Sequence, residues 1–184
     1  MAGEAEPSDD ALNRRVIAGD RSAFDVLVAR HEARLRGFLR KLCGNAAPAD
    51  DLAQETFVRA WQRCRQFDGS GSDSSYAAWL VRIGWRLFLD LERHEQHVRR
   101  KHAQSAEPFE IVDPNPGTRI DVLAALATLP SRDRACILLC DVEGWSHSEA
   151  ARLLDLPLGT LKSIIPRARD TLRRHLTLAP ETPR

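Results

Sequence analysis

The stretch SHSEAARLLDLPLGTLKS, residues 146–163, decides how the C-terminal part of the chain folds. Its first half predicts a short helix over 147–154, because small and apolar residues recur on one face. The sequence DLPLG, residues 155–159, predicts a tight corner, and a longer helical pattern runs from 158 to 176. Two helices joined by such a corner indicate a helix-turn-helix, whose second helix can enter the major groove of DNA.

The second helix of this motif carries the polar and basic side chains that a DNA contact needs. The residues expected on its exposed N-terminal face are Leu158, Thr160, Lys162 and Ser163. The arginines expected to meet phosphates further along are Arg167, Arg169, Arg173 and Arg174. The alternative is an αα-hairpin in an ordinary bundle with a solvated basic face. DNA binding is favoured, since a plain bundle needs neither the corner nor the clustered arginines.

The rest of the chain is also predicted to be helical, with no β-type alternation of any length. Apolar residues recur at spacings of three and four from position 9 to about 97, broken by a turn-rich loop over 68–75. Periodicity then disappears where three prolines and several acidic residues predict a flexible linker. The fold class is therefore all-α, with two small helical domains over 10–101 and 119–178 joined by a linker over 102–118.

Composition places the chain among soluble proteins and sets limits on its partners. Of the 184 residues, 43% are hydrophobic and 29% charged, and no apolar run reaches the roughly 18 to 20 residues of a bilayer span. The acidic first ten residues do not resemble a signal peptide, so a cytoplasmic protein is expected. Because the net charge is only +1, nucleic acid would have to be held by local basic surfaces.

The cysteines and other reactive residues do not indicate an enzyme. Cys136 and Cys140, with His147 nearby, have a spacing that could bind a metal, but their apolar surroundings favour small core residues. Four cysteines in helical patterns do not suggest a disulfide scaffold either. Paired carboxylates, an activated nucleophile and a Gly-rich phosphate loop are not apparent. No catalytic residue, cofactor, metal or small-molecule substrate is therefore expected.

Two sets of longer motifs resemble those of a known family. The C-terminal motifs are LPSRDRA (129–135), EGWSHSEAA (143–151), LPLGTLKS (156–163) and RARDTL (167–172). They resemble the fourth conserved region of bacterial sigma factors, and DDLAQETFVRAW (50–61) with AWLVRI (78–83) resembles the second. With only a linker between them, the two regions are similar to those of the extracytoplasmic-function (ECF) subfamily.

The resemblance implies a promoter-specificity subunit that binds core RNA polymerase at the β′ clamp helices and the β flap, and that also binds promoter DNA. Control by an anti-sigma factor is expected. Asp51, Gln54 and Glu55 match the family's clamp contact, and their spacing places them on one helix face. The alternative for these residues is a solvated face whose acids complement the helix dipole.

The family also implies where each promoter element binds. The residues matched to minus-ten contacts are Asp68, Ser70, Ser72, Ser74, Arg82, Arg86 and Arg93. The loop would shape a pocket for a flipped base, and the arginines would meet phosphates and bases. Arg86 replaces the Asn of many relatives, which leaves the base preference open. For minus thirty-five, the matched residues are Leu158, Thr160, Lys162, Ser163, Arg167 and Arg169.

The recognition helix departs from the family pattern at two positions. Ile164 stands where relatives usually have Arg, and Pro166 lies well inside the helix. A proline there removes one hydrogen bond and clashes with the carbonyl of residue 162, costing roughly 3 kcal/mol or a kink. Either the helix bends after Ile165 and remains functional, or the segment reads minus thirty-five weakly.

Two other functions fit parts of the same pattern. The chain would be a stand-alone helix-turn-helix regulator if its first lobe served dimerisation or sensing. It would be a decoy for an anti-sigma factor if it had lost DNA binding. Transcription from a defined promoter with purified core polymerase separates the three hypotheses.

Overall fold

The computed structural model describes residues 6–69, 75–102 and 118–178, and within these ranges the chain is helical with no strand. The elements of the first lobe are α1 (Asp9–Ile17), α2 (Arg21–Cys43), α3 (Ala46–Gln62), the short 3-10 helix η1 (Cys64–Gln66) and α4 (Tyr76–His102). Those of the second lobe are α5 (Thr118–Ala127), α6 (Ser131–Ile137), the π-helical turn η2 (Leu138–Val142), α7 (His147–Leu153) and α8 (Leu158–Leu178). The all-α prediction is confirmed.

Local sequence signals set the helix ends of the first lobe. The Asp20 carboxylate accepts a hydrogen bond from the backbone N–H of Ala23 and so caps α2. At its other end, Gly44 adopts a φ of 70°, a left-handed conformation that glycine tolerates, and this ends the helix. Asn45 then caps α3. The chain thus reverses between α2 and α3 in two residues.

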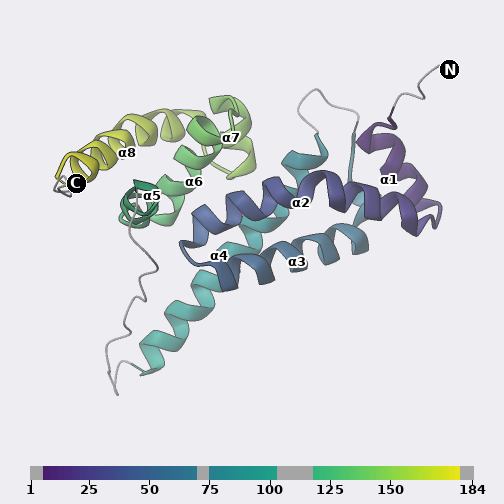
Figure 1. The fold of residues 1–184 in the computed structure, drawn as a ribbon, viewed down its shortest axis with the longest axis horizontal. Helices are drawn as coiled ribbons and strands as arrows, with labels where there is room; N and C mark the ends of the chain where they lie inside the picture. Colours follow the sequence, from purple (N-terminus) through teal and green to yellow (C-terminus); the bar gives the residue numbers. More distant parts are fainter. Residues whose placement is uncertain (1–5, 70–74, 103–117, 179–184) are drawn as a thin grey trace.

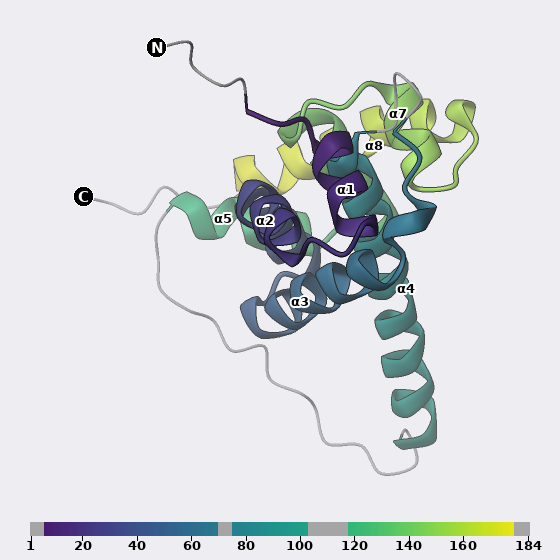
Figure 2. The same ribbon diagram turned by 90° about the vertical axis from the view of Figure 1, so that its right-hand side faces the viewer.

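The first lobe packs α1, α3 and α4 around α2 (Figure 1). Buried aromatic and aliphatic side chains from all four helices form its core, including Leu12, Phe38, Leu39, Phe57 and Leu80. At Gly84 an added Cβ would lie 3.2 Å from the Thr56 hydroxyl, so glycine lets α4 approach α3 closely. Further along, Phe88 is still buried and Glu92 accepts a hydrogen bond from Ser131 of α6, and only the C-terminal end of α4 extends clear of the other helices (Figure 2).

The second lobe is built on α8, which α5, α6 and α7 contact. The apolar face of α8 is buried, and its members are Leu161, Ile164, Ile165 and Ala168. Ser146 and Glu149 form a reciprocal capping box that starts α7, and hydrogen bonding from Ser146 lowers the pKa of Glu149. The predicted helix-turn-helix is present, with Asp155 at the corner in a left-handed conformation.

The two lobes pack against each other, a feature that the sequence did not predict. Helix α2 contacts α6 and η2, and α4 contacts α7. The buried Arg134 guanidinium of α6 donates a 2.6 Å hydrogen bond to the carbonyl of Leu42 at the end of α2. Of the predicted linker, residues 103–117 lie outside the described ranges, and positions 102 and 118 are helix ends.

Candidate polymerase and nucleic-acid interfaces

The predicted clamp-binding residues share one exposed face of α3. Asp51 and Gln54 are exposed, and the half-buried Glu55 carboxylate lies 2.6 Å from the Arg59 Nε. We call Asp51, Gln54 and Glu55 the clamp ridge. The neighbouring Asp50 is engaged differently, because hydrogen bonding from Arg40 lowers its pKa. The ridge thus presents Asp51 and Gln54 as exposed side chains, and Glu55 as a carboxylate paired with Arg59.

An apolar hollow adjoins the clamp ridge, and sequence reasoning missed it. Its volume is about 430 Å³ and its lining residues are Arg21, Phe24, Asp25, Phe57, Val58, Trp61 and Gln62. Val58 lies one turn beyond Gln54 on α3 and is 47% exposed. The Phe24 and Trp61 rings pack edge to face, and their centroids lie 5.0 Å apart. The ridge therefore continues into an exposed apolar surface.

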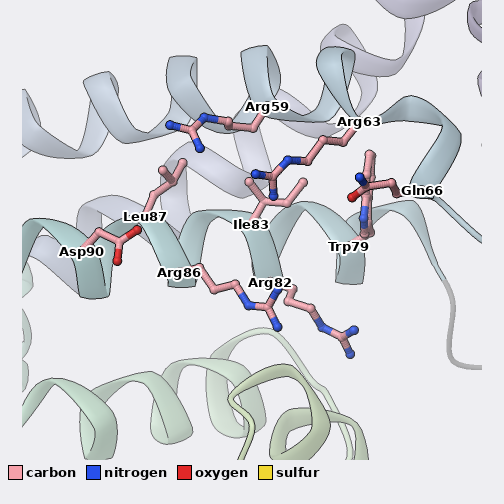
Figure 3. Close-up of a pocket in the computed structure, with 9 residues that line it drawn as sticks. All are labelled: Arg59, Arg63, Gln66, Trp79, Arg82, Ile83, Arg86, Leu87 and Asp90. Carbon is pink, nitrogen blue, oxygen red and sulfur yellow. The ribbon is translucent and has the colours of Figure 1, made fainter.

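A basic hollow of about 190 Å³ lies between α3 and α4 (Figure 3). Arg59 and Arg63 approach it from α3, and Arg82 and Arg86 come from α4 and point toward the second lobe. The lining thus includes four arginines and a single carboxylate, that of Asp90. Such an arrangement attracts an anionic ligand.

Two of these arginines, Arg63 and Arg82, have few hydrogen-bond or ion-pair partners within the described part of the protein. The Arg82 Nε is buried without a hydrogen-bond partner. Neither Arg63 nor Arg82 has an ion-pair partner among the described residues. Arg63 is exposed, so its donors are open to phosphate or base oxygens, which accept strongly from arginine, and the Arg82 Nε would gain a partner only if the site rearranged.

The structure brings together only part of the predicted minus-ten set. Arg82 and Arg86 line the basic hollow, whereas Arg93 pairs with Asp90 at 2.7 Å further along α4 and does not line it. Asp68 borders an adjoining hollow of about 160 Å³ that Arg82 also lines. The remaining predicted residues lie outside the described ranges; they are Ser70, Ser72 and Ser74.

Sequence reasoning missed two residues of this site, Arg59 and Arg63, and it favoured a core position for Trp79 over base stacking. Arg63 caps the C-terminal end of α3 four residues after Arg59, and Arg82 and Arg86 are four apart on α4, a spacing that places residues on one side of a helix. This matched spacing of the two arginine pairs is visible in the sequence and could have indicated a shared basic surface. Trp79 is half-buried and lines both hollows, so its ring can meet a base.

The first turns of α8 present the predicted base-reading residues. Leu158 is 40% exposed, and exposed side chains follow at Thr160, Lys162 and Ser163. The predicted phosphate contacts carry internal partners: Arg167 lies 3.4 Å from the Asp133 carboxylate. Arg169 forms two hydrogen bonds with Asp141, which raise the pKa of Arg169. A phosphate would have to replace these carboxylates.

The structure shows how both departures from the family pattern are accommodated. Ile164 is only 3% exposed and packs in the lobe's core, so an arginine in this conformation would bury its charge. Helix α8 continues through Pro166 from Leu158 to Leu178, so the helix does not end there (Figure 1).

Replacing Pro166 with alanine should stabilise the second lobe by about 1 to 3 kcal/mol, because alanine restores the missing helical hydrogen bond and removes the ring. Thermal unfolding measures this gain. Affinity for minus-thirty-five DNA should change less than threefold, because the base-reading turn precedes the proline. An unchanged melting temperature would mean that the helix already accommodates the ring at no cost.

The cysteines behave as apolar core residues. Burial raises the pKa of the Cys136 thiol to about 12, and those of Cys43 and Cys140 to about 11. Thiols that stay protonated are poor nucleophiles and poor metal ligands. Among the described residues, no group of three or more His, Cys, Asp and Glu side chains could hold a metal ion.

None of the described helices is both long and apolar enough to cross a membrane.

Known protein families match both lobes. Sigma-70 region 2 matches residues 27–101, and sigma-70 region 4 matches residues 119–172. The ECF RNA polymerase sigma factor SigE of Mycolicibacterium smegmatis is 35% identical over 93% of this chain and 70% of its own length. SigM of Mycobacterium tuberculosis is 35% identical over 96% of this chain and 88% of its own.

Solved structures share the arrangement of the helices. The sigma factor RpoE of Bartonella quintana, in complex with the anti-sigma factor NepR, has a TM-score of 0.73 and 25% identity over 85% of this chain and 98% of its own. CnrH, in complex with the cytosolic domain of CnrY, has a TM-score of 0.69 and 30% identity over 95% of this chain and all of its own. The chain belongs to the ECF subfamily of sigma-70 RNA polymerase sigma factors, which are transcription initiation factors.

Proposed function

We propose that this sigma factor binds core RNA polymerase through the clamp ridge and reads promoter DNA with both lobes. The region over 10–101 holds polymerase and the minus-ten element, the region over 119–178 holds the minus-thirty-five element, and residues 102–118 link them. The observation that carries this proposal is the basic hollow on α3 and α4, where Arg63 and Arg82 lack internal partners among the described residues. It lies beside the acidic ridge on the same helix, so one helix can meet protein and DNA.

The basic hollow accounts for recognition of the minus-ten strand. Arg63 and Arg82 bind phosphates, while Trp79 offers a ring on which a base can stack. Arg86, at the rim, adds a further donor where many relatives have Asn. Because two lining arginines come from α3, the strand contacts both helices rather than α4 alone.

Catalysis belongs to the polymerase, and this chain contributes binding and positioning. It needs no catalytic residue, cofactor or small-molecule substrate, and it acts in the cytoplasm with the polymerase. Both solved relatives described above were complexed with anti-sigma partners, which supports control of this chain by an anti-sigma factor. A stand-alone regulator or a decoy would need no clamp ridge, so these alternatives are disfavoured.

Replacing both Arg63 and Arg82 with alanine should reduce open-complex formation by about 30-fold or more, since removing each DNA-binding side chain costs about 1 to 3 kcal/mol. Transcription from a defined promoter with purified core polymerase measures this loss. Binding to core polymerase should be unchanged.

Two variants serve as controls for this experiment. Arg93→Ala should reduce open complexes less than threefold, because the Arg93 side chain does not line the hollow, although its partner Asp90 does. Arg14→Ala, which removes an exposed side chain of α1, should have no effect. Equal losses for Arg93→Ala and the double variant would place the DNA elsewhere along α4 and contradict the assignment.

A further inference from the structure

The junction between the basic hollow and the adjoining hollow carries an uncharged amide. Three residues line both hollows, and they are Gln66, Trp79 and Arg82. The Gln66 side chain is exposed, and its amide makes no hydrogen bond in the part of the chain that the structure describes. Figure 3 shows Gln66 and Trp79 at the same end of the basic hollow. A free amide, which can both donate and accept, thus shares this end with a ring on which a base can stack.

The backbone that carries Gln66 is fixed by hydrogen bonds on both sides of the short helix η1. Gln66 is the last residue of η1, and its N–H donates a 2.8 Å hydrogen bond to the Arg63 carbonyl. The side chain of Asn13 in α1, which is only 2% exposed, donates a 2.9 Å bond to the Cys64 carbonyl. Helix η1 is therefore tied to α1, and Gln66 leaves it at a defined position.

The Trp79 ring is held by two neighbouring aromatic rings. The Phe67 centroid lies 5.4 Å from that of Trp79 and 5.1 Å from that of Tyr76. The Tyr76 and Trp79 centroids are also 5.4 Å apart, and Tyr76 is almost fully buried. Because Phe67 directly follows Gln66 in the chain, the amide and the ring belong to one rigid unit. Groups held in this way without a ligand can select among ligands by shape and hydrogen bonding.

The arginines and the amide suit different parts of a nucleotide. Phosphates are the same whatever the base, so arginines that bind them add affinity without selecting a sequence. An amide fits an amino group next to a ring nitrogen, the pattern that adenine presents at N6 and N7. Adenine repeats this pattern at N6 and N1, so both edges of an unpaired adenine fit a glutamine. Cytosine offers it on one edge only and has a smaller ring to stack on Trp79.

We propose that Gln66 is a specificity-determining residue that selects an unpaired adenine stacked on Trp79. Its Nε2 donates to a ring nitrogen of the adenine, and its Oε1 accepts from the N6 amino group. This inference rests on the proposed minus-ten site and deepens it, because base selection is assigned to Gln66 and phosphate binding to the arginines.

Selection from a promoter library tests this assignment in the complete polymerase holoenzyme. The minus-ten segment is randomised, and the templates recovered as open complexes are sequenced. One position should be enriched in adenine about fivefold or more over every other base, because a bidentate amide contact discriminates by at least that factor. In Gln66→Ala the enrichment at this position should fall below about twofold, while the preferences at other positions stay.

Two further substitutions separate base selection from a structural role. Gln66→Arg supplies a group that pairs with guanine, so the enriched base at this position should change from adenine to guanine. Gln66→Glu keeps the size but removes the amide donor, so it should lose the adenine preference. Gln96→Ala, on the exposed end of α4, is the matched control, because it removes an amide that lines neither hollow. An unchanged preference in Gln66→Ala, or an equal loss on all templates, would overturn the proposal.

The Arg63→Ala and Arg82→Ala pair distinguishes failure of this inference from failure of the proposed minus-ten site. This pair should lower open complexes on all templates and keep the adenine preference among those that form. If it does so while Gln66→Ala changes no preference, the site stands and selection by Gln66 is wrong. If the pair leaves open complexes unchanged, the proposed site is wrong. Gln66 is still decided, because its base preference is measured within each protein.

Discussion

Replacing Asp51 and Glu55 with lysine should abolish capture of core RNA polymerase by this sigma factor. Both carboxylates lie on the exposed side of α3, so the change reverses two charges where the family's clamp contact is matched. The free energy of unfolding should fall by only about 1 kcal/mol, because the change breaks one internal ion pair, the exposed one between Glu55 and Arg59. A pull-down of core polymerase and chemical denaturation measure the two quantities.

Glu32→Lys provides a matched control for the ridge. Glu32 pairs with Arg36 one turn away on α2, at 2.7 Å, just as Glu55 pairs with Arg59. This variant should cost the same stability and retain full polymerase binding. If the ridge variant still captures polymerase, or if Glu32→Lys loses it equally, the surface that binds the clamp helices is not the ridge.

Replacing Arg134 with methionine should reduce the free energy of unfolding by about 3 kcal/mol. The buried guanidinium donates hydrogen bonds to three backbone carbonyls, which belong to Leu42, Ala127 and Leu129. Methionine fills much of the volume but leaves these acceptors without a donor, at about 1 kcal/mol or more each. Burial also lowers the pKa of this guanidinium, in keeping with a charge held mainly by backbone dipoles.

Urea denaturation followed by circular dichroism measures this loss, and Arg132→Met is its control. Arg132 lies two residues away on α6 with its side chain exposed, so its replacement should change stability by no more than about 0.5 kcal/mol. Equal stabilities for the two variants would show that water satisfies the three carbonyls once the arginine is gone.

The helices and the clamp ridge could be predicted from the sequence because both depend on local order. Capping residues and apolar spacing fix where α2 begins and ends, and the same spacing places Asp51 opposite the buried Ala53 and Phe57. The burial of Ile164 could also have been predicted from the sequence. It continues the apolar series of α8, but the family pattern suggested a basic position.

The docking of the lobes and the basic hollow could not be predicted in the same way. Periodicity shows which face of a helix is apolar, but it does not say which other helix that face meets. Contacts between the lobes join residues that are far apart in the sequence. Arg86 bonds to Asp155, 69 residues away, and Arg34 bonds to Glu143, 109 residues away. The π-helical turn at Leu138–Val142 adds an irregularity that apolar spacing does not indicate, and Glu143 follows it.

The arginines of α8 have a consequence for how the protein moves among the many sites of a genome. Arg167, Arg169 and Arg173 each pair with an aspartate of the same lobe. When such an arginine transfers to a phosphate, the counterion released from DNA is offset by a carboxylate that loses its partner. Affinity then depends less steeply on salt than the number of arginines suggests. If these arginines contact phosphates as proposed, we expect random DNA to be held loosely and base contacts at the promoter to carry a larger share of the discrimination.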